Sequence, residues 1–260
     1  VPSPTALNDL RATKPLVLEL TDGVGDAERL RLARAFCSKV LGAYWEAMIA
    51  TTGVPAAMVP CPVGARRLSP RQAALAVTWG ADLVQLPRPL ASYHLSALYT
   101  ALLPEAYRAE FGVFFTPPAL TDRLLDLIEA NGLDWTTAQI LDPAAGGGAF
   151  VSPVAVRMVQ ALEAAGNTPS AILAHLEAHL HGMELDAFSA WMSHVLLEVA
   201  IWETAQRAGR RLGPLVEAGD ALDLVAARPA GRPTGFDLIV GNPPDGKVRR
   251  SPERRARFAR

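Results

Sequence analysis

The chain has 260 residues, and half of them are hydrophobic, enough to bury a sizeable core in one large domain or two small ones. Its formal net charge of −1 excludes a global electrostatic attraction to nucleic acid, so any basic surface must be local. Cys37 and Cys61 lack disulfide or ligand spacing, and Glu46 and several prolines break the apolar stretch over 43–65. We therefore expect a cytoplasmic protein without membrane contact.

Residues 1–110 are predicted to form a mostly helical N-terminal region. Asp26 is placed to cap a helix whose apolar residues recur at helical spacing, and Ser69-Pro70 is a typical helix start. Another apolar helix is expected from Tyr93 to Leu103. Because no catalytic pattern occurs there, the sequence favours a packing or partner-contact role and leaves a DNA-contacting role open.

The stretch Phe-Gly-Val-Phe-Phe-Thr-Pro-Pro, residues 111–118, is predicted to turn into a further helix. Thr116 is placed to cap this helix and Pro117 to occupy its first position. The helix is expected to stop at Asn131-Gly132. Its apolar face carries Leu120, Leu124, Leu127 and Ile128.

The glycine-rich stretch Asp-Pro-Ala-Ala-Gly-Gly-Gly-Ala-Phe, residues 142–150, follows a short candidate strand, residues 139–141, and precedes a helix. Such a turn aims backbone N–H groups and the positive end of the helix dipole into the crevice where α/β sheets bind ligands. A phosphate-binding loop would need Lys-Ser/Thr where Ala149-Phe150 stand. Asp142 would repel a pyrophosphate but can accept hydrogen bonds from an ammonium group, so among adenosine-bearing ligands the loop favours S-adenosylmethionine.

A second candidate strand, His181–Asp186, carries Glu184, a carboxylate suited to accept hydrogen bonds from a ribose diol. Glu184 lies about twice as far from the glycine loop as the ~20 residues of a dinucleotide fold. The helix expected over 168–178 must therefore be an insertion or part of an extended crossover.

Two further candidate strands also end in polar residues. Residues 215–218 are followed by Gly219-Asp220, and residues 236–240, a continuous apolar run, are followed by Gly241-Asn242. One long helix is expected over 188–208. This alternation predicts a doubly wound, mainly parallel α/β sheet with its polar strand ends along one edge.

Taken in order, Phe-Phe-Thr-Pro-Pro, the glycine loop, Glu-Leu-Asp, Gly-Asp and Asn-Pro-Pro resemble the motifs of N6-adenine DNA methyltransferases from restriction–modification and phage-defence systems. The resemblance implies a Rossmann-like methyltransferase core over 111–260 that uses S-adenosylmethionine. It also implies a sheet truncated after its fourth strand, and double-stranded DNA bound through a recognition domain outside this chain. A restriction or defence subunit is a further candidate partner.

The resemblance assigns cofactor roles to individual residues. Thr116, Pro117, Asp142 and the glycine loop would hold the methionine part, Glu184 the ribose and Asp220 the adenine amine. The full cofactor-binding set is Phe115, Thr116, Pro117, Asp142, Ala144, Gly146, Gly148, Glu184, Leu185, Asp220 and Ala221. In this set Leu185 is a candidate apolar wall, and Ala221 supplies a backbone N–H.

By the same resemblance, Asn242-Pro243-Pro244 would be the catalytic turn. The Asn242 side-chain oxygen and the Pro243 carbonyl would accept both N–H bonds of an adenine amine and push its nitrogen towards sp³ geometry. Two prolines stiffen this turn, and reaching the amine in a duplex requires the base to be flipped out.

Asp245 completes the predicted catalytic set but departs from the family, which has an aromatic residue there, most often tyrosine, that stacks on the flipped base. A carboxylate cannot stack, and losing a base–aromatic stack costs about 1–3 kcal/mol. Engineered or natural loss of activity is favoured over specialisation for another substrate. An ordinary Asp-Gly turn stays open as a structural interpretation.

Three functions are thus compatible with the sequence: a DNA adenine methyltransferase, a protein-glutamine methyltransferase, and a catalytically silent module that binds cofactor and DNA. Asp245 favours the last. His175, His179 and His181 lie close together but lack a third ligand with suitable spacing, so no metal site is expected. The arginine-rich stretch Lys247–Arg260 is either a phosphate contact or a solvated face.

Overall fold

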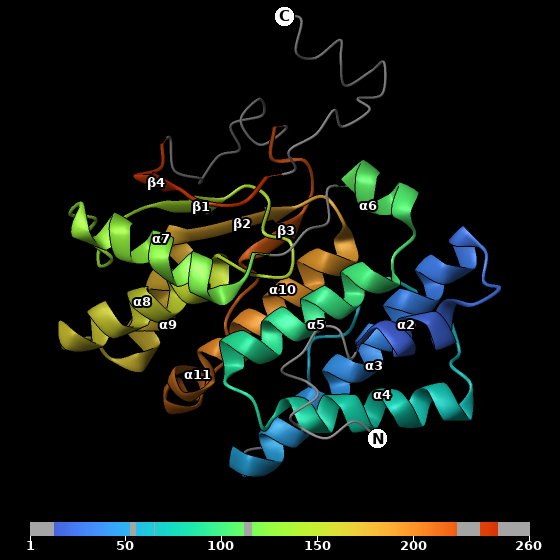
Figure 1. Cartoon of the computed structure of the whole chain (residues 1–260). Coiled ribbons are helices and arrows are strands. Elements are labelled where there is room, and N and C mark those ends of the chain that lie inside the picture. Colours follow the sequence, from blue (N-terminus) through green and yellow to red (C-terminus); the bar gives the residue numbers. More distant parts are fainter. Residues whose placement is uncertain (1–12, 53–55, 65, 112–115, 223–234, 244–260) are drawn as a thin grey trace, which may run out of the picture.

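The computed structural model of the chain describes residues 13–52, 56–64, 66–111, 116–222 and 235–243 (Figure 1). These ranges contain helices and a parallel sheet. The helices are α2 (Thr13–Thr21), α3 (Asp26–Thr52), α4 (Pro70–Leu83), α5 (Arg88–Leu102), α6 (Glu105–Phe111), α7 (Pro118–Ala130), α8 (Val151–Ala164), α9 (Pro169–His179), α10 (Ala187–Ala200) and α11 (Trp202–Ala208). The strands are β1 (Ile140–Asp142), β2 (Leu180–Glu184), β3 (Val216–Ala218) and β4 (Leu238–Ile239).

The N-terminal region is helical as predicted. Helix α3 begins at Asp26, and α4 begins after Ser69, whose side chain accepts from the Gln72 N–H while Gln72 reaches back to the Ser69 N–H. Together with α2 and α5, these helices surround an apolar cluster, here called the helical core, that includes Phe36, Trp45 and Tyr99.

The sheet has the strand order β3-β2-β1-β4, and every pair of neighbours is parallel. The predicted α/β fold class is therefore confirmed. Crossovers run from β1 to β2 to β3 in one direction, and the chain then returns to the other side of β1 to form β4. The strand order reverses between β1 and β4, and open α/β sheets bind their ligands at such a reversal.

Two helices, α8 and α9, fill the connection from β1 to β2, so the crossover is extended as the spacing of Glu184 suggested. They pack against β2 and against each other. Their apolar side chains belong to a second apolar cluster, here called the sheet core, which includes Leu173 of α9, Ile140 of β1 and Leu197 of α10.

The prediction of one long helix over 188–208 was wrong. The helix breaks at Ile201, which has φ −110° and ψ 22°, and α11 begins at Trp202. The break allows Trp202 to pack in the helical core while Ile201 and Ala205 pack in the sheet core.

Helix α10 separates the two cores. Phe188 and Val195 belong to the helical core, whereas Ala190 and Leu197 belong to the sheet core, and nearly every residue of α10 is buried. Figure 1 shows α10 and α5 between the sheet and the pair α3 and α4. A helix that is apolar on all sides is stable only when it is covered on all sides, and both regions of the chain are needed to cover α10.

The start of α7 differs from the prediction. Pro118, not Pro117, occupies the first helical position; Pro117 is the N-cap with ψ 141°, and Thr116 makes no cap hydrogen bond. A residue that precedes proline is driven out of the α region, so the second proline of the pair must start the helix. The helix ends at Asn131-Gly132 as predicted, with Gly132 at φ +89°.

None of the described helices combines the length and apolarity that crossing a bilayer requires.

Candidate functional site

The glycine loop connects β1 to α8 through two residues in the left-handed region, Gly146 at φ +54° and Gly148 at φ +84°. A Cβ atom on Gly148 would lie 3.0 Å from the Ser193 hydroxyl and 3.1 Å from the Ser152 hydroxyl. The Ala145 N–H donates to the Met183 carbonyl oxygen at 2.8 Å, which holds the loop against β2. Both the backbone conformation and the packing therefore favour glycine at 148.

Glu184 lies at the end of β2 and links the loop to two strands. Its Oε2 accepts from the Gly146 N–H at 2.8 Å, its Oε1 from the Asp186 N–H at 2.9 Å, and its backbone carbonyl from the Gly219 N–H at 2.8 Å. Burial raises the pKa of Glu184. Each carboxylate oxygen has two acceptor positions, so the side chain can still accept from a diol while it holds the loop.

Asp142 ends β1 and is almost completely buried, with 1% of its surface exposed. Its Oδ1 accepts from the Ala144 N–H at 3.1 Å, whereas Oδ2 has no hydrogen-bond partner among the residues that the structure describes. Burial, with a smaller contribution from the Glu184 charge, raises the pKa of Asp142 to about 7. A buried carboxylate oxygen without a partner fits a ligand that brings its own ammonium group.

The turn after β4 meets this carboxylate at the strand-order reversal. A Cβ atom on Gly241 would lie 2.8 Å from Asp142 Oδ1, so only glycine allows the approach. The next residue, Asn242, donates from Nδ2 to Thr116 Oγ1 at 3.3 Å. The fold thus brings together a predicted catalytic residue, Asn242, and two predicted cofactor residues, Thr116 and Asp142, from three distant parts of the sequence.

Asn242 and Pro243 are exposed, as contact with an external substrate requires. Thr116 is buried with 5% of its surface exposed, and Pro117 is exposed. Pro244, Asp245 and Phe115 lie outside the described residues, as does the arginine-rich stretch Lys247–Arg260.

The polar residue that follows β3 is more exposed than Asp142 and Glu184. Asp220 follows β3, is partly exposed, and its Oδ1 accepts from the Leu222 N–H at 3.2 Å, which shapes the turn after the strand. Ala221 is partly buried, and so is Leu185, which directly follows β2. Because the sheet is parallel, Asp142 and Glu184, which end their strands, and Asp220 and Asn242, which follow theirs, all lie along the carboxyl-terminal edge of the sheet.

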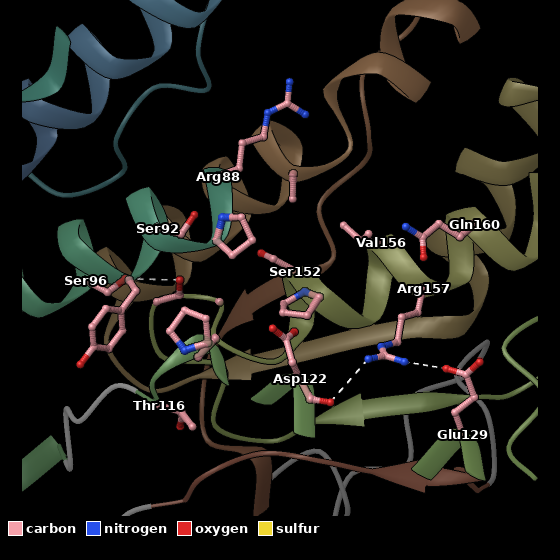
Figure 2. Close-up of a pocket in the computed structure, with 18 residues that line it drawn as sticks. Arg88, Ser92, Ser96, Thr116, Asp122, Glu129, Ser152, Val156, Arg157 and Gln160 are labelled. Atoms are coloured by element: carbon pink, nitrogen blue, oxygen red, sulfur yellow. Dashed lines mark hydrogen bonds and ion pairs between the residues drawn. The ribbon is translucent and has the colours of Figure 1, made fainter. Parts of the chain in front are cut away.

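A cavity of about 750 Å³ adjoins the glycine loop between α5, α7 and α8 (Figure 2). In Figure 2, Ser92 and Ser96 of α5 lie on one side, and Ser152 and Val156 of α8 on the other. Of the predicted site residues, Thr116 and Gly148 line it. Its volume lies within the ~300–1,000 Å³ typical of small-molecule sites.

Apart from Thr116, the polar side chains that line this cavity were not predicted from the sequence. The Arg157 guanidinium is paired with Asp126 and Glu129, and that of Arg88 with Glu203, so both cations are neutralised. The Ser152 hydroxyl is buried and has no hydrogen-bond partner in the described part of the chain. No sequence motif marks these residues, because they come from helices that only the fold brings together.

The histidines form no recognisable metal centre. The rings of His175 and His179 stack with centroids 3.8 Å apart and an interplanar angle of 7°, and His179 Nδ1 lies 3.0 Å from the His175 carbonyl oxygen. Within the described ranges, no group of three or more His, Cys, Asp or Glu residues is arranged to hold a metal ion.

No protein-family model matches the chain, and no curated protein sequence matches it. Among solved structures, the chain is similar to the cryo-electron microscopy structure of a DrdV–DNA complex, with a TM-score of 0.54 and 16% sequence identity over 92% of this chain. The match covers 27% of the DrdV chain. At this identity the similarity supports the fold of the chain.

Proposed function

We propose that this chain carries the S-adenosylmethionine-binding core of an amino-methyltransferase that acts on the exocyclic N6 amine of an adenine flipped out of DNA. The observation that carries the proposal is the meeting of Asn242 with Thr116 and of Gly241 with Asp142 at the strand-order reversal. A methyltransferase needs this juxtaposition, because its target-binding turn must lie beside its cofactor-binding residues.

The residues at this edge fit the cofactor group by group. The buried Asp142 carboxylate would accept from the cofactor's ammonium, and Glu184 from its ribose hydroxyls. The methionine part would extend past Thr116 towards the cavity beside the loop. When bound, S-adenosylmethionine supplies an electrophilic methyl group.

The chain's own residues would prepare the amine. With Nδ2 of Asn242 donating to Thr116, Oδ1 is left to accept one N–H of the target, and the Pro243 carbonyl would accept the other. Holding both N–H bonds by acceptors draws the nitrogen lone pair out of the ring and directs it at the methyl donor. The proton would leave after transfer, so no strong base is required.

DNA is the proposed partner. The similar DrdV structure is a complex with DNA, and the present chain corresponds to about a quarter of that protein. Sequence recognition is therefore proposed to lie in polypeptide outside this chain, with a restriction or defence subunit as a candidate partner. Because the net charge of the chain is −1, we do not propose broad electrostatic binding by this core.

The test is calorimetric titration with S-adenosylmethionine, followed by transfer of labelled methyl to unmethylated genomic DNA by the full-length protein and its Asp245→Tyr variant. We expect binding by both proteins and transfer by Asp245→Tyr, because tyrosine restores the base stack. The matched control is Asn242→Ala in the Asp245→Tyr background, which should retain cofactor binding and lose transfer.

A second candidate, a catalytically silent module, is favoured by Asp245 itself. If both proteins bind cofactor and neither transfers methyl to DNA, the silent module replaces the proposed enzyme. An absence of cofactor binding by either protein would overturn the cofactor assignment as a whole.

A further inference from the structure

Asp186, two residues beyond Glu184, makes far more polar contacts than a helix cap requires. It is the N-cap of α10, where Oδ1 accepts from the Phe188 N–H at 3.3 Å, and Oδ2 accepts from the Ser189 N–H at 3.2 Å and the Ser189 hydroxyl at 2.9 Å. These bonds satisfy the first turn of the helix. The sequence predicted the end of a strand at this position, and that prediction was wrong.

Three further donors reach the same carboxylate from the helical N-terminal region. Arg34 of α3 donates from Nη2 to Oδ1 at 2.9 Å, Tyr107 of α6 donates to Oδ1 at 3.0 Å, and Tyr99 of α5 donates to Oδ2 at 2.8 Å. Burial, and after it the Asp186 charge, raise the pKa of both phenols, so they remain donors at physiological pH. Asp186 is buried with 2% of its surface exposed, so little water competes for these bonds.

The bonds continue from Asp186 into the candidate site. The Asp186 N–H donates to Glu184 Oε1 at 2.9 Å, and Glu184 Oε2 accepts from the Gly146 N–H at 2.8 Å. Helix α5 also contacts the loop directly, since the Ser96 hydroxyl lies 3.5 Å from the Gly147 carbonyl oxygen, one turn before Tyr99. The N-terminal helices therefore reach the glycine loop in two ways, through Asp186 and Glu184 and directly through Ser96.

We propose that Asp186 is a positioning residue for the cofactor site: Arg34, Tyr99 and Tyr107 hold its carboxylate, and its N–H fixes the Glu184 carboxylate between the glycine loop and the ribose. The role of the N-terminal helices is then to set the geometry of the sheet edge as well as to cover α10. The ribose part of this inference rests on the proposed function, whereas the loop part rests on the hydrogen bonds alone.

The test variant is Asp186→Asn, because asparagine is as good a helix-capping residue as aspartate but its NH₂ group replaces one carboxylate oxygen and so faces either Arg34 and Tyr107 or Tyr99 with a donor. Tyr99→Phe and Tyr107→Phe each remove one donor and leave the cap intact. The matched control is Glu198→Gln. Glu198 is a buried carboxylate on the same helix whose Oε1 accepts from Arg211 Nε at 2.8 Å, and it makes no bond to the loop or to Glu184 among the described residues.

The first readout is hydrogen exchange of the loop amides, residues 144–148, in the full chain without ligand. We expect at least about tenfold faster exchange in Asp186→Asn, about threefold faster in the tyrosine variants, and no change in Glu198→Gln beyond its effect on global stability. Loop exchange that is unchanged in Asp186→Asn, or changed equally in Glu198→Gln, would overturn the proposal whether or not cofactor binds.

The second readout is calorimetric affinity for S-adenosylhomocysteine and for its 2′-deoxyribose analogue. If Asp186 acts through Glu184 and the diol, Asp186→Asn weakens the ribose form about tenfold and the deoxy form little, so the preference between the two falls. Equal weakening of both would mean a general structural effect and would overturn the ribose part. Wild-type protein that binds neither compound would instead overturn the proposed function, and the exchange result would still decide the loop part.

Discussion

The helical core is held together by large apolar side chains, whereas the sheet edge carries buried polar groups. The largest fully buried side chains, Trp45, Tyr44, Tyr99, Phe36 and Phe188, all belong to the helical core. The sheet edge, by which we mean the carboxyl-terminal ends of the parallel strands, is formed by strands of only two to five residues. The buried Asp142 side chain at this edge has one oxygen without a hydrogen-bond partner within the described structure. One region is closely packed with apolar side chains, and the other holds buried polar groups.

This difference separates the packing that stabilises the chain from the edge at which we propose that the cofactor binds. Helix α10 belongs to both cores, and two buried carboxylates near its ends, Asp186 and Glu198, are held by Arg34 and Arg211. Arg211 also donates to the Ala57 carbonyl and lies over the Trp45 ring, 4.9 Å from its centroid. Through Arg34 and Asp186 the helical region thereby stabilises an edge that would be costly to maintain alone.

The largest effect is expected in the helical core. Phe36→Ala should lower the free energy of unfolding by about 3–5 kcal/mol, because a fully buried ring is replaced by a cavity. Urea denaturation measures the loss. Cofactor affinity, measured well below the melting temperature, should stay within about twofold of wild type. A large loss of affinity at unchanged fold would show that packing inside the helical core, and not only the bonds to Asp186, sets the geometry of the sheet edge.

Replacing Asp142 is expected to raise the free energy of unfolding, not to lower it. Because its folded-state pKa is raised, the contribution of Asp142 to stability is most favourable below the unfolded pKa of 3.8 and falls as the pH rises to about 7. Asp142→Asn should remove this fall and gain about 2–4 kcal/mol at pH 8, with little change at pH 4, in urea titrations across that range. The same variant should lose cofactor affinity. If the free energies of unfolding of wild type and Asp142→Asn changed with pH in parallel, burial would not raise the pKa of Asp142.

Gly148→Ala should have an intermediate effect, a loss of about 1–3 kcal/mol with weakened cofactor binding, because alanine is strained at φ +84° and its Cβ would crowd two serine hydroxyls. Gly166→Ala is the matched control, since Gly166 has φ +80° but nothing within 4 Å of an added Cβ. Thermal unfolding of both variants separates backbone strain from packing at the loop. Equal losses would mean that the serine contacts are unimportant.

The smallest effect is expected on the open side of α7. Leu120 is 60% exposed, so Leu120→Ala should change the free energy of unfolding by less than about 0.5 kcal/mol, whereas Leu125→Ala, at a fully buried position, should cost about 2–5 kcal/mol. Comparing an exposed and a buried leucine of one helix gives a scale for the stability effects of the other substitutions. A loss at Leu120 close to that at Leu125 would indicate that Leu120 is covered in solution.

Much of the site was predictable because its signals are local. Glycine at 146 and 148, and polar residues directly after apolar runs, are readable from a few neighbouring residues, and the structure places each of them at a strand end or in the loop. Errors arose where two local signals competed. Pro117 and Pro118 were both acceptable helix starts, and Asp186 was compatible with the end of a strand or with a helix cap.

The alternation of strands and helices, the glycine loop and the polar residues at the strand ends could be predicted from short stretches of sequence, because they depend on periodicity and backbone conformation over short distances. The fold was needed to reveal that Asn242 donates to Thr116, that Gly241 leaves no room for a Cβ atom beside Asp142, and that side chains of α3, α5 and α6 donate to Asp186. Such contacts depend on strand order and on how α10 packs between two cores. They join residues more than 70 positions apart, a separation over which local sequence carries no geometric information.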